Sequence, residues 1–533
     1  MAVYVPESFT PEESDVLRRY FTNLDGPVFA LVNLPEVVKG ALFARYSRSP
    51  KSLRRLFLDE FVGDLDVSGD QSIDATVGLD RAEELYERVF FDYGDDSVAQ
   101  LGGVHLACEQ ASNLLTKILE WGRLMSYLEQ STRYIAYDSR LGGRYRYYRD
   151  PEVLAGPLGT RYVGDIDRIF DAYSTSVDSV TEHVRSTVAR GSDDSEFVYR
   201  TATRAKALDA VRGILPAAAT SNVGIYGTGQ AFEALLLRMR AHPLPESREY
   251  ADLMLHELRK VIPSFLRRVD LPDRGGRWSE YLASTKAQTA TVVESLLGGT
   301  PVEPASEVEL VDFDPEAEDK LLAAICYSHS NLPEHQLLAR VRALGADERV
   351  SLIRAYVGER ENRRHKPGRA FERSFYRFDV LSDYGAFRDM QRHRMLTIEW
   401  QRLTPNHGYT RPELVDDAGA SPVFDEAMER SAALYDALDP VHHDQAPYAV
   451  SMAYRMRYVM QFNAREAIHM LELRSSPQGH PSYRRVALEM HRLIAEQAGH
   501  HAVAAAMSHM TMEAPDLERL ESERRAEERR TIT

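Results

Sequence analysis

Residues 391–400 read "QRHRMLTIEW", in which an Arg-His-Arg triplet at 392–394 precedes an apolar run. Three adjacent potential cations stand out in a chain whose formal net charge is −16. A similar stretch occurs earlier, because "WGRLMSYLEQ" at 121–130 resembles "RHRMLTIEWQ" at 392–401. The triplet therefore raises two questions: whether the chain is duplicated, and which anion or ring its cations bind.

Three further pairs of stretches resemble each other, and all occur in the same order along the chain. They are "ALFARYSRSPKSL" (41–53) with "LAAICYSHSNLPEH" (322–335), "YYRDPEVLAG" (147–156) with "GYTRPELVDDAG" (408–419), and "ALLLRMRAHP" (234–243) with "HMLELRSSPQ" (469–478). Matches in register indicate an internal repeat. We expect an N-terminal copy over 1–295, a linker over 296–318, a C-terminal copy over 319–515 and a charged tail over 516–533.

Composition limits the function classes. The chain has 533 residues, too many for one ordinary core, so two domains are expected. Its acidic balance argues against non-specific nucleic-acid binding but is compatible with a local basic pocket for a small anion. No apolar run approaches the roughly 20 residues that span a bilayer. Cys108 and Cys326 are the two cysteines of the sequence, too few for a disulfide framework. No export signal is visible either, so a cytoplasmic protein is expected.

Helical signals dominate the chain. A capping box, Thr10-Pro11-Glu12-Glu13, predicts a helix start. Apolar residues recur at helical spacing over 105–128, 205–215, 231–240, 248–262, 337–356, 424–437 and 449–473. The best strand candidate is "RYRYYR" at 144–149, where Arg and Tyr alternate. The fold class is therefore a helix-rich α+β protein.

The stretch "EQSTRY" (129–134) carries a candidate phosphate site. If the chain is extended after the predicted helix, Ser131 and Arg133 point the same way. A hydroxyl donor beside a guanidinium suits a phosphate group. On these residues alone, a surface loop pair is the alternative.

The stretch "FNAREAIHMLELR" (462–474) places polar groups on an apolar helix. Asn463 and Arg474 lie eleven residues apart, about three turns, and so near one face. Arg465 and His469 are spaced i,i+4 and are neighbours on another stripe. The alternative is an amphipathic helix with a solvated face.

The repeated stretches resemble the signature of the flavin-dependent thymidylate synthases, which runs Arg-His-Arg, then Ser, then Ser-x-Arg. The first copy, "WGRLMSYLEQSTRY" (121–134), retains Arg123, Ser126 and the "EQS-x-RY" end. It has Trp121 and Gly122 where Arg and His are expected.

The second copy is incomplete in the complementary way. The stretch "RHRMLTIEWQRLTP" (392–405) retains the triplet, while Thr397 replaces the middle Ser. Arg402 and Thr404 stand where Ser and Arg are expected. Each copy thus retains what the other has lost.

The resemblance implies a fold and an assembly. Members of that family are homotetramers with active sites between subunits. The chain would then hold two tandem copies of the family's domain, each with a small, mostly antiparallel sheet and long helices. A homodimer would act as a pseudo-tetramer, with a composite site formed between the nucleotide-phosphate side of the N-terminal copy and the flavin side of the C-terminal copy.

The resemblance also implies roles for individual residues. The nucleotide would be bound by Gln130, Ser131, Arg133, Arg212 and Arg474, with Arg474 at the pyrimidine. The flavin would be bound by Glu372, Arg392, His393, Arg394, Asn463, Arg465 and His469. Catalysis would rest on Arg474, Arg392 and His393. His469 stands where Asn is usual, and Gln100 is a weaker first-copy counterpart of Glu372.

The implied reaction is the reductive methylation of dUMP to dTMP, with methylenetetrahydrofolate as co-substrate and FAD reduced by NADPH. A flavin route needs no Cys nucleophile, and Cys108 and Cys326 lie in apolar stretches without an adjacent base, as core thiols do. Cations near the ring, Arg474 foremost, would stabilise charge that develops on its carbonyls.

Two other functions fit the same residues. Phosphate and flavin contacts do not report on the 2′ position, so C5 modification of UMP is an alternative. Because signature positions are missing in both copies, a non-catalytic flavin or nucleotide sensor is another. No metal site is expected, because the adjacent His pairs 442–443 and 500–501 direct their side chains apart.

Overall fold

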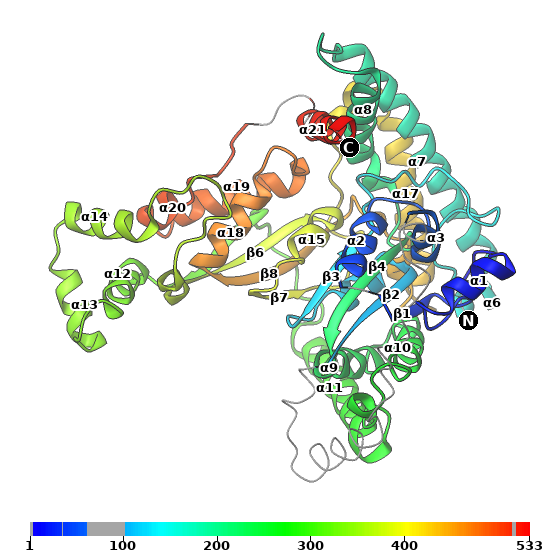
Figure 1. Cartoon of the computed structure of the whole chain (residues 1–533), viewed down its shortest axis with the longest axis horizontal. Helices are drawn as coiled ribbons and strands as arrows, with labels where there is room; N and C mark the ends of the chain where they lie inside the picture. The colour runs from blue at the N-terminus through cyan, green and yellow to red at the C-terminus, as the bar shows by residue number, and fades with distance from the viewer. Residues whose placement is uncertain (1–3, 35, 61–101, 514–516, 518, 533) are drawn as a thin grey trace. The chain divides into compact units, whose positions relative to one another are not determined.

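The computed structural model describes residues 4–34, 36–60, 102–513, 517 and 519–532. The chain divides into two compact units, each with its own antiparallel sheet and covering helices (Figure 1). Unit 1 comprises Met1–Asp171, Pro216–Val302 and Arg430–Ala449. Unit 2 comprises Ala172–Leu215, Glu303–Glu429 and Val450–Thr533.

The sheet of unit 1 has four strands in the order β1-β2-β4-β3. The strands are β1 (Val28–Leu31), β2 (Gly103–Ser112), β3 (Met125–Glu129) and β4 (Thr220–Thr228). Helices α9 (Gly229–Arg240) and α10 (Pro245–Leu258) pack on each other, and α10 packs against β1 (Figure 1). Their apolar faces, with Phe232 and Met254, join Leu106 and Ile225 of the sheet in one buried core.

The other helices of unit 1 are shorter or lie outside this core. They are α1 (Pro11–Leu17), α2 (Glu36–Tyr46), α3 (Leu53–Glu60), α5 (Asn113–Leu119), α6 (Pro151–Ala155), η4 (Ser264–Leu266), η5 (Pro272–Gly276), α11 (Arg277–Leu297) and η7 (Ala446–Ala449). The predicted capping box at α1 is confirmed: Thr10 and Glu13 each accept the other's backbone N–H.

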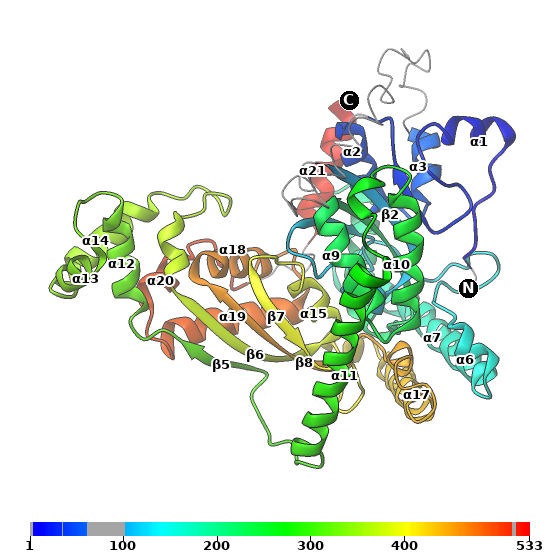
Figure 2. The same ribbon diagram turned by 90° about the horizontal axis from the view of Figure 1, so that it is seen from below.

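The sheet of unit 2 has the order β5-β6-β8-β7, again antiparallel throughout. The strands are β5 (Val308–Phe313), β6 (Phe375–Asp383), β7 (Leu396–Trp400) and β8 (Arg455–Asn463). Helix α19 (Pro481–Glu496) packs against β5 and β6 and against α18 (Ala464–Arg474), as Figure 2 shows.

The remaining helices belong to unit 2 or are divided between the two units. Within unit 2 lie α8 (Glu196–Val211), η3 (Arg212–Ile214), α12 (Ala317–Tyr327), α13 (Glu334–Arg342), α14 (Ala346–Val357), η6 (Arg369–Arg373), α15 (Tyr384–Met390), α16 (Glu413–Asp417), α20 (His501–Ala506) and α21 (Leu520–Ile532). Helices α7 (Gly159–Thr187) and α17 (Ser421–Leu438) belong partly to each unit. Across the described residues, no helix combines the length and apolarity that a bilayer crossing requires.

The two sheets confirm the predicted duplication. Both place the second strand in sequence between the first and the fourth, and both have the third strand at the edge. In each copy a capped helix follows the second strand, with Ser112 capping α5 and Asp383 capping α15. A second capped helix follows the fourth strand, with Thr228 capping α9 and Asn463 capping α18. The predicted helix-rich α+β fold with two tandem copies is therefore correct.

Two predicted helices are partly wrong. Residues 105–128 form β2, α5 and β3, because β2 is a central strand with nearly continuous burial and gives no alternating pattern. Residues 449–473 form β8 before α18 begins. Strand β8 alternates buried and half-buried positions, but its Met, Gln and Arg side chains also suit a helix.

Two other expectations differ from the structure, and one open alternative is decided by it. The predicted strand at 144–149 is irregular, with isolated bridges from Tyr147 to Ala219 and from Leu141 to Arg144. The predicted linker over 296–318 contains β5, which buries Val308 and Leu310 against its own sheet. For the charged tail, a helix and a disordered end were both open; the structure has the helix α21, which packs on α8.

The compact units differ from the two copies in sequence, because each unit contains a segment of the other copy. In unit 2, backbone N–H groups of Met452 and Ala453 donate to the carbonyls of Leu215 (2.9 Å) and Gly213 (2.8 Å). In unit 1, Ala218 N–H donates to the Tyr448 carbonyl at 3.0 Å. The exchanged segments, Ala172–Leu215 and Arg430–Ala449, are therefore integral to the units that receive them.

Candidate active site

The predicted flavin-side residues of unit 2 converge at the ends of β6 and β8. At the end of β6, Asp383 accepts the Ala386 N–H at 2.8 Å and starts α15. After α15 ends at Met390, the Arg392–Arg394 triplet forms a turn before β7. At the end of β8, Asn463 accepts the Glu466 N–H at 2.9 Å and starts α18. Two strand-to-helix junctions thus hold the site.

Three guanidinium groups surround the carboxylate of Asp389 in unit 2. Arg212 Nη1 lies 3.3 Å from Oδ2, and Arg392 Nη1 lies 3.5 Å from Oδ1. Arg474 Nη1 lies 3.9 Å from the same Oδ1. The side chains of Arg212, Asp389 and Arg474 are only 4%, 11% and 12% exposed. The Arg392 side chain is 36% exposed, and Arg212 also lies near the carboxyl group of Asp383. Since the three cations outnumber these two acids, the cluster suits a further anion.

Arg212 and Arg474 come from different copies of the repeat. Arg212 was predicted to bind the nucleotide phosphate from the N-terminal copy, and it lies in unit 2 because its segment is exchanged. It meets Arg474 of the C-terminal copy at the shared Asp389. Side chains of both copies are therefore combined within one compact unit.

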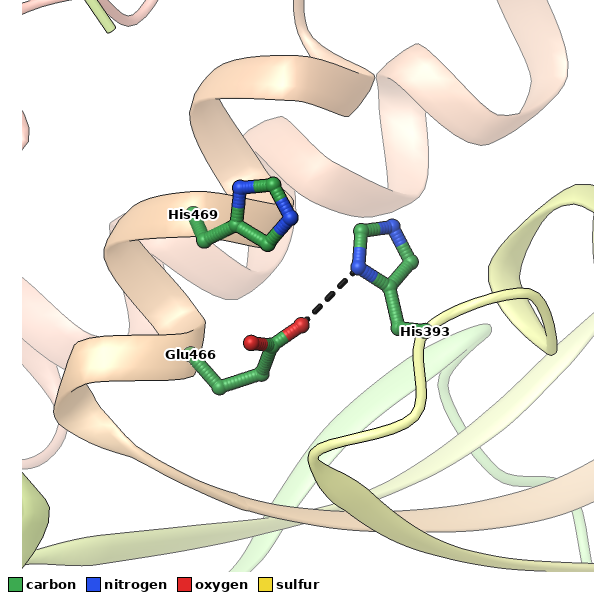
Figure 3. A group of neighbouring side chains, drawn as sticks. All are labelled: His393, Glu466 and His469. Atoms are coloured by element: carbon green, nitrogen blue, oxygen red, sulfur yellow. Dashed lines mark hydrogen bonds and ion pairs between the residues drawn. The ribbon is translucent and has the colours of Figure 1, made fainter. Parts of the chain in front are cut away.

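His393 connects this cluster to α18. Arg474 Nε donates to His393 Nε2 at 3.0 Å, so Nε2 must be the acceptor, because a guanidinium has donors alone. The proton of the neutral ring is then on Nδ1, which donates to Glu466 Oε1 at 2.9 Å, as Figure 3 shows. Burial and the nearby Arg474 hold the pKa of His393 well below its usual value. Burial raises the pKa of Glu466 to about 7.

His393, Glu466 and His469 could also be considered as metal ligands. Their ligand atoms lie within 4.8 Å of one another (Figure 3). A metal on His393 Nδ1 would move the ring proton to Nε2, where it would oppose the N–H of Arg474. Burial, then Lys366 and other cations, lower the pKa of His469 to about 4, and the same cations would repel a metal ion. The group therefore suits hydrogen bonding to an anionic ligand better than metal binding.

The remaining predicted flavin residues lie near α18. Arg465 Nε donates to the Pro367 carbonyl at 2.9 Å, and its Nη1 lies 3.4 Å from Glu372 Oε1. Glu372 also pairs with Arg369. Asn463 acts as the helix cap described above, and Arg394 is half-buried in the triplet turn. Gln100 lies outside the described residues.

The predicted phosphate segment, Gln130–Arg133, lies in unit 1 and forms a turn. Ser131 Oγ accepts the Arg133 N–H at 3.2 Å, so the predicted extended conformation is wrong. The buried Gln130 donates from Nε2 to the Ser49 carbonyl at 2.7 Å, which gives it a role in the local fold. These residues and the cation cluster belong to different units, so their joint site stays a prediction.

Three acids of this site, Asp389, Glu466 and Asp383, were not predicted as site residues. A spacing signal existed for the first two, because Asp389 and Arg392, and Glu466 and His469, are each i,i+3 pairs on helical turns. No local signal marked Asp383, because its neighbours Arg212 and Ser482 come from distant parts of the chain.

Unit 1 holds a buried network of one carboxyl group and two hydroxyl groups at the equivalent place. Ser112 at the cap of α5 donates from N and Oγ to Glu246, at 2.8 and 2.5 Å, and the Tyr448 hydroxyl donates at 2.7 Å. In unit 2 the acid is at the cap, as Asp383, and Ser482 occupies the position after the first proline of the facing helix. The exchanged segment thus brings a phenol to unit 1 and a guanidinium, Arg212, to unit 2.

Comparisons with known proteins agree with the repeat. The family described as thymidylate synthase complementing protein matches residues 45–264 and again residues 309–499. A UPF0159 protein of Chlamydia pneumoniae is 39% identical over 487 residues, covering 90% of this chain and 91% of that protein. A UPF0159 protein of Chlamydia muridarum is 37% identical over 527 residues, covering 97% and 98%.

More distant similarities extend to an archaeon and to a solved structure. The UPF0159 protein Ta1429 of Thermoplasma acidophilum is 30% identical over 483 residues, covering 86% of this chain and 92% of that protein. A UMP/dUMP methylase, PolB from Streptomyces cacaoi bound with 5-Br dUMP, has 20% identity and a TM-score of 0.30, covering 37% of this chain and 94% of that one. With the family match in both repeats and the shared strand order, the chain belongs to the thymidylate synthase complementing protein family, the flavin-dependent thymidylate synthases, as a double-length member.

Proposed function

We propose that this chain is a flavin-dependent methyltransferase that converts dUMP into dTMP, with methylenetetrahydrofolate as carbon donor and NADPH as the source of reducing equivalents. The observation that best supports this proposal is the convergence of Arg212, Arg392 and Arg474 on Asp389. A uracil nucleotide needs cations at its phosphate and at the ring carbonyls on which charge develops. The cluster offers guanidinium groups for both.

FAD fits the residues around α18. Lys366, Arg363, Arg474 and Arg465 lie close enough to His469 to lower its pKa, and such an excess of cations suits the diphosphate of the cofactor. Glu372, Arg392, His393, Arg394, Asn463, Arg465 and His469 would hold it. When bound, reduced FAD supplies the hydride that a reductive methylation requires.

Arg474 would act on the pyrimidine directly. Its Nε is fixed by His393, its Nη1 lies 3.9 Å from Asp389, and the guanidinium also interacts with Tyr483, so its orientation is set from several sides. A guanidinium held in this way stabilises negative charge on a ring carbonyl without having to reorient during the reaction. His393 and Glu466 are positioning residues in this scheme, and the proton on His393 Nδ1 stays in the hydrogen bond to Glu466.

The phosphate segment of unit 1 would complete the nucleotide site. Gln130, Ser131 and Arg133 would bind the phosphate together with Arg212, in a homodimer that acts as a pseudo-tetramer in the cytoplasm. The turn in which Ser131 and Arg133 lie supports this assignment, because it holds a hydroxyl and a guanidinium two residues apart in a fixed loop.

An absorption spectrum and a substrate assay test the proposal. Purified protein should bind FAD, and incubation with dUMP, methylenetetrahydrofolate and NADPH should yield dTMP by mass spectrometry. The Arg474→Lys and Arg133→Ala variants should lose turnover, while Arg457→Lys, which changes a guanidinium paired with Asp379 on the sheet, should retain it. Failure to take up flavin would contradict the enzyme assignment. Methylation of UMP in place of dUMP would contradict the substrate.

A further inference from the structure

Both oxygens of the Asp389 carboxylate contact guanidinium groups. These come from three elements: Arg212 from η3, Arg392 from the turn after α15, and Arg474 from the last residue of α18. Guanidinium groups arranged about a pair of carboxylate oxygens also fit a phosphate, because phosphate oxygens accept hydrogen bonds from the same N–H donors. Asp389 therefore lies where an anionic ligand group would be expected.

Arg212 shows that Asp389 does not satisfy the cluster. Its Nη2 is buried and finds no hydrogen-bond acceptor among the residues that the structure describes, while its Nη1 meets Asp389. A buried, charged N–H group that makes no hydrogen bond costs free energy, and a second acceptor would remove that cost. A phosphate has more acceptor oxygens than a carboxylate and would satisfy Nη1 and Nη2 together.

Gly385 leaves room at this donor. A Cβ atom built on Gly385 would lie 3.0 Å from Asp383 Oδ1, 3.2 Å from Arg212 Nη2 and 3.3 Å from Arg212 Nε. The absence of a side chain on the first turn of α15 thus preserves space beside the donor that lacks a partner.

The position of Asp389 on α15 adds a second reason for displacement. Asp389 is in the last turn of this helix, where the partial negative charge of the helix dipole disfavours a carboxylate. The three guanidinium groups hold it there against that effect. When a ligand takes over those groups, Asp389 loses what stabilises it at this place.

We propose that Asp389 is an internal counter-ion that occupies the phosphate position of the unit 2 cluster and is displaced when a nucleotide monophosphate binds. It neutralises the buried Arg212 and Arg474 and the partly exposed Arg392 in the empty protein, and it lowers the affinity for the nucleotide by competing with its phosphate. The inference rests on the proposed function for the choice of nucleotide, but its physical content is competition between a carboxylate and a phosphate.

The test compares Asp389→Asn with a matched control, Asp379→Asn, which removes a carboxylate that pairs with Arg457 on the sheet at 3.1 Å. In phosphate-free buffer, Asp389→Asn should lower the melting temperature more than the control does. Added inorganic phosphate or dUMP should raise the melting temperature of Asp389→Asn more than that of the wild type. Its dissociation constant for dUMP should fall by about tenfold, as expected for removing one close competing charge.

Deoxyuridine separates competition for phosphate from a general change in the pocket. Its affinity should change much less than that of dUMP, because it carries no phosphate and would meet the cluster only through Arg474 at its ring. An unchanged or weaker affinity for dUMP in Asp389→Asn, or an equal gain for deoxyuridine, would overturn the inference. If Asp389→Asn folds in phosphate but not in chloride of the same ionic strength, the inference is supported; insolubility in both would contradict it.

These measurements involve no methyl transfer and so are independent of the proposed reaction. If the protein fails to methylate dUMP but Asp389→Asn binds dUMP more tightly, the reaction is wrong and the counter-ion role stands. If the protein makes dTMP and Asp389→Asn shows no gain in affinity, the reaction stands and the counter-ion role falls.

Discussion

Arg474 and His393 are joined by a hydrogen bond of 3.0 Å in which the guanidinium donates to the imidazole. The bond requires a neutral ring with its proton on the other nitrogen, toward Glu466. Glu466, His393 and Arg474 therefore form an ordered chain in which each group determines the orientation of the next. This hydrogen-bonded chain uses a neutral imidazole to orient a cation and leaves the charge of that cation intact.

Removing the acceptor for His393 should weaken turnover more than it weakens binding. Glu466→Ala frees the His393 ring to change tautomer, so that Arg474 loses its fixed orientation, and we expect kcat to fall by about tenfold to a hundredfold. Glu466→Gln keeps an acceptor oxygen and should stay within about threefold of the wild type. Steady-state kinetics with dUMP and binding of dUMP measured by calorimetry separate the two effects.

The hydrogen bonds from Glu466 through His393 to Arg474 also predict how the effects of two substitutions combine. Because Glu466 acts through His393, the double variant of Glu466→Ala with His393→Ala should be no worse than His393→Ala alone. Fully additive losses would contradict the ordered chain. An unaltered far-ultraviolet circular dichroism spectrum for each variant excludes general unfolding as the cause.

A methyl group at Gly385 should interfere with the phosphate site. In Gly385→Ala, the new Cβ would approach Arg212 Nη2 to 3.2 Å and force that side chain to shift. We expect the dissociation constant for dUMP to rise by about tenfold, roughly the effect of one charge-assisted hydrogen bond. Gly164→Ala is the control, since its Cβ would meet nothing within 4 Å and α7 should gain stability from the change. Equal dUMP affinity in both variants would show that a side chain at position 385 does not affect dUMP binding.

The buried Glu246 should make the protein less stable as the pH rises. Burial raises its pKa to about 7, above the usual 4.5, so the folded state holds a proton that the unfolded state releases between these values. Its contribution to the free energy of unfolding therefore falls from about pH 4.5 to about pH 7, by up to roughly 3 kcal/mol. Urea unfolding across this range should show the fall.

Glu246→Gln isolates that effect from other titrating groups. The amide keeps an acceptor for Ser112 but does not titrate, so the difference in unfolding free energy between variant and wild type should grow in favour of the variant from pH 5 to pH 7. A difference that is constant over this range would show that Glu246 does not change its protonation state there. Burial lowers the pKa of His242 to about 4, and this group acts in the opposite direction in both proteins and cancels in the comparison.

The exchanged segments predict that neither copy of the repeat folds alone. A fragment of residues 303–533 lacks Ala172–Leu215 and with it the carbonyl partners of Met452 and Ala453. A fragment of residues 1–302 lacks Tyr448, one of the donors that satisfy the buried Glu246. We expect each fragment to aggregate when expressed alone and the two to form a soluble complex when expressed together. Size-exclusion chromatography and circular dichroism would check both statements, and two well-folded separate fragments would contradict them.

Much of the fold could be predicted from the sequence, because duplication leaves a signal that does not depend on secondary-structure propensity. The repeated stretches at 121–130 and 392–401 correspond to β3 and β7 with the turns before them, at the same position in both sheets. The strands themselves were harder to predict. Strand β2 is buried on both faces and β8 is built from residues that also favour helices, so neither gives a clear period.

The site could be predicted only in part. The motif residues Arg392, His393 and Arg474 do lie together in unit 2, since the family resemblance preserves their spacing. Asp389 and Glu466 are not in the motif, and their importance comes from what tertiary folding brings beside them. Arg212 lies in unit 2 because its segment, Ala172–Leu215, packs with the other copy of the repeat. No local sequence pattern indicates this exchange.

The acid and the hydroxyl that face each other in each unit have traded places: Ser112 with Glu246 in one, Asp383 with Ser482 in the other. Reverting either member singly would set two carboxylates against each other in a buried space or leave two hydroxyls without an acid. Evolution back toward identical halves must therefore cross a less stable intermediate at this point. The paired exchange therefore keeps the acid on the facing helix in unit 1 and at the helix cap, near Arg212, in unit 2.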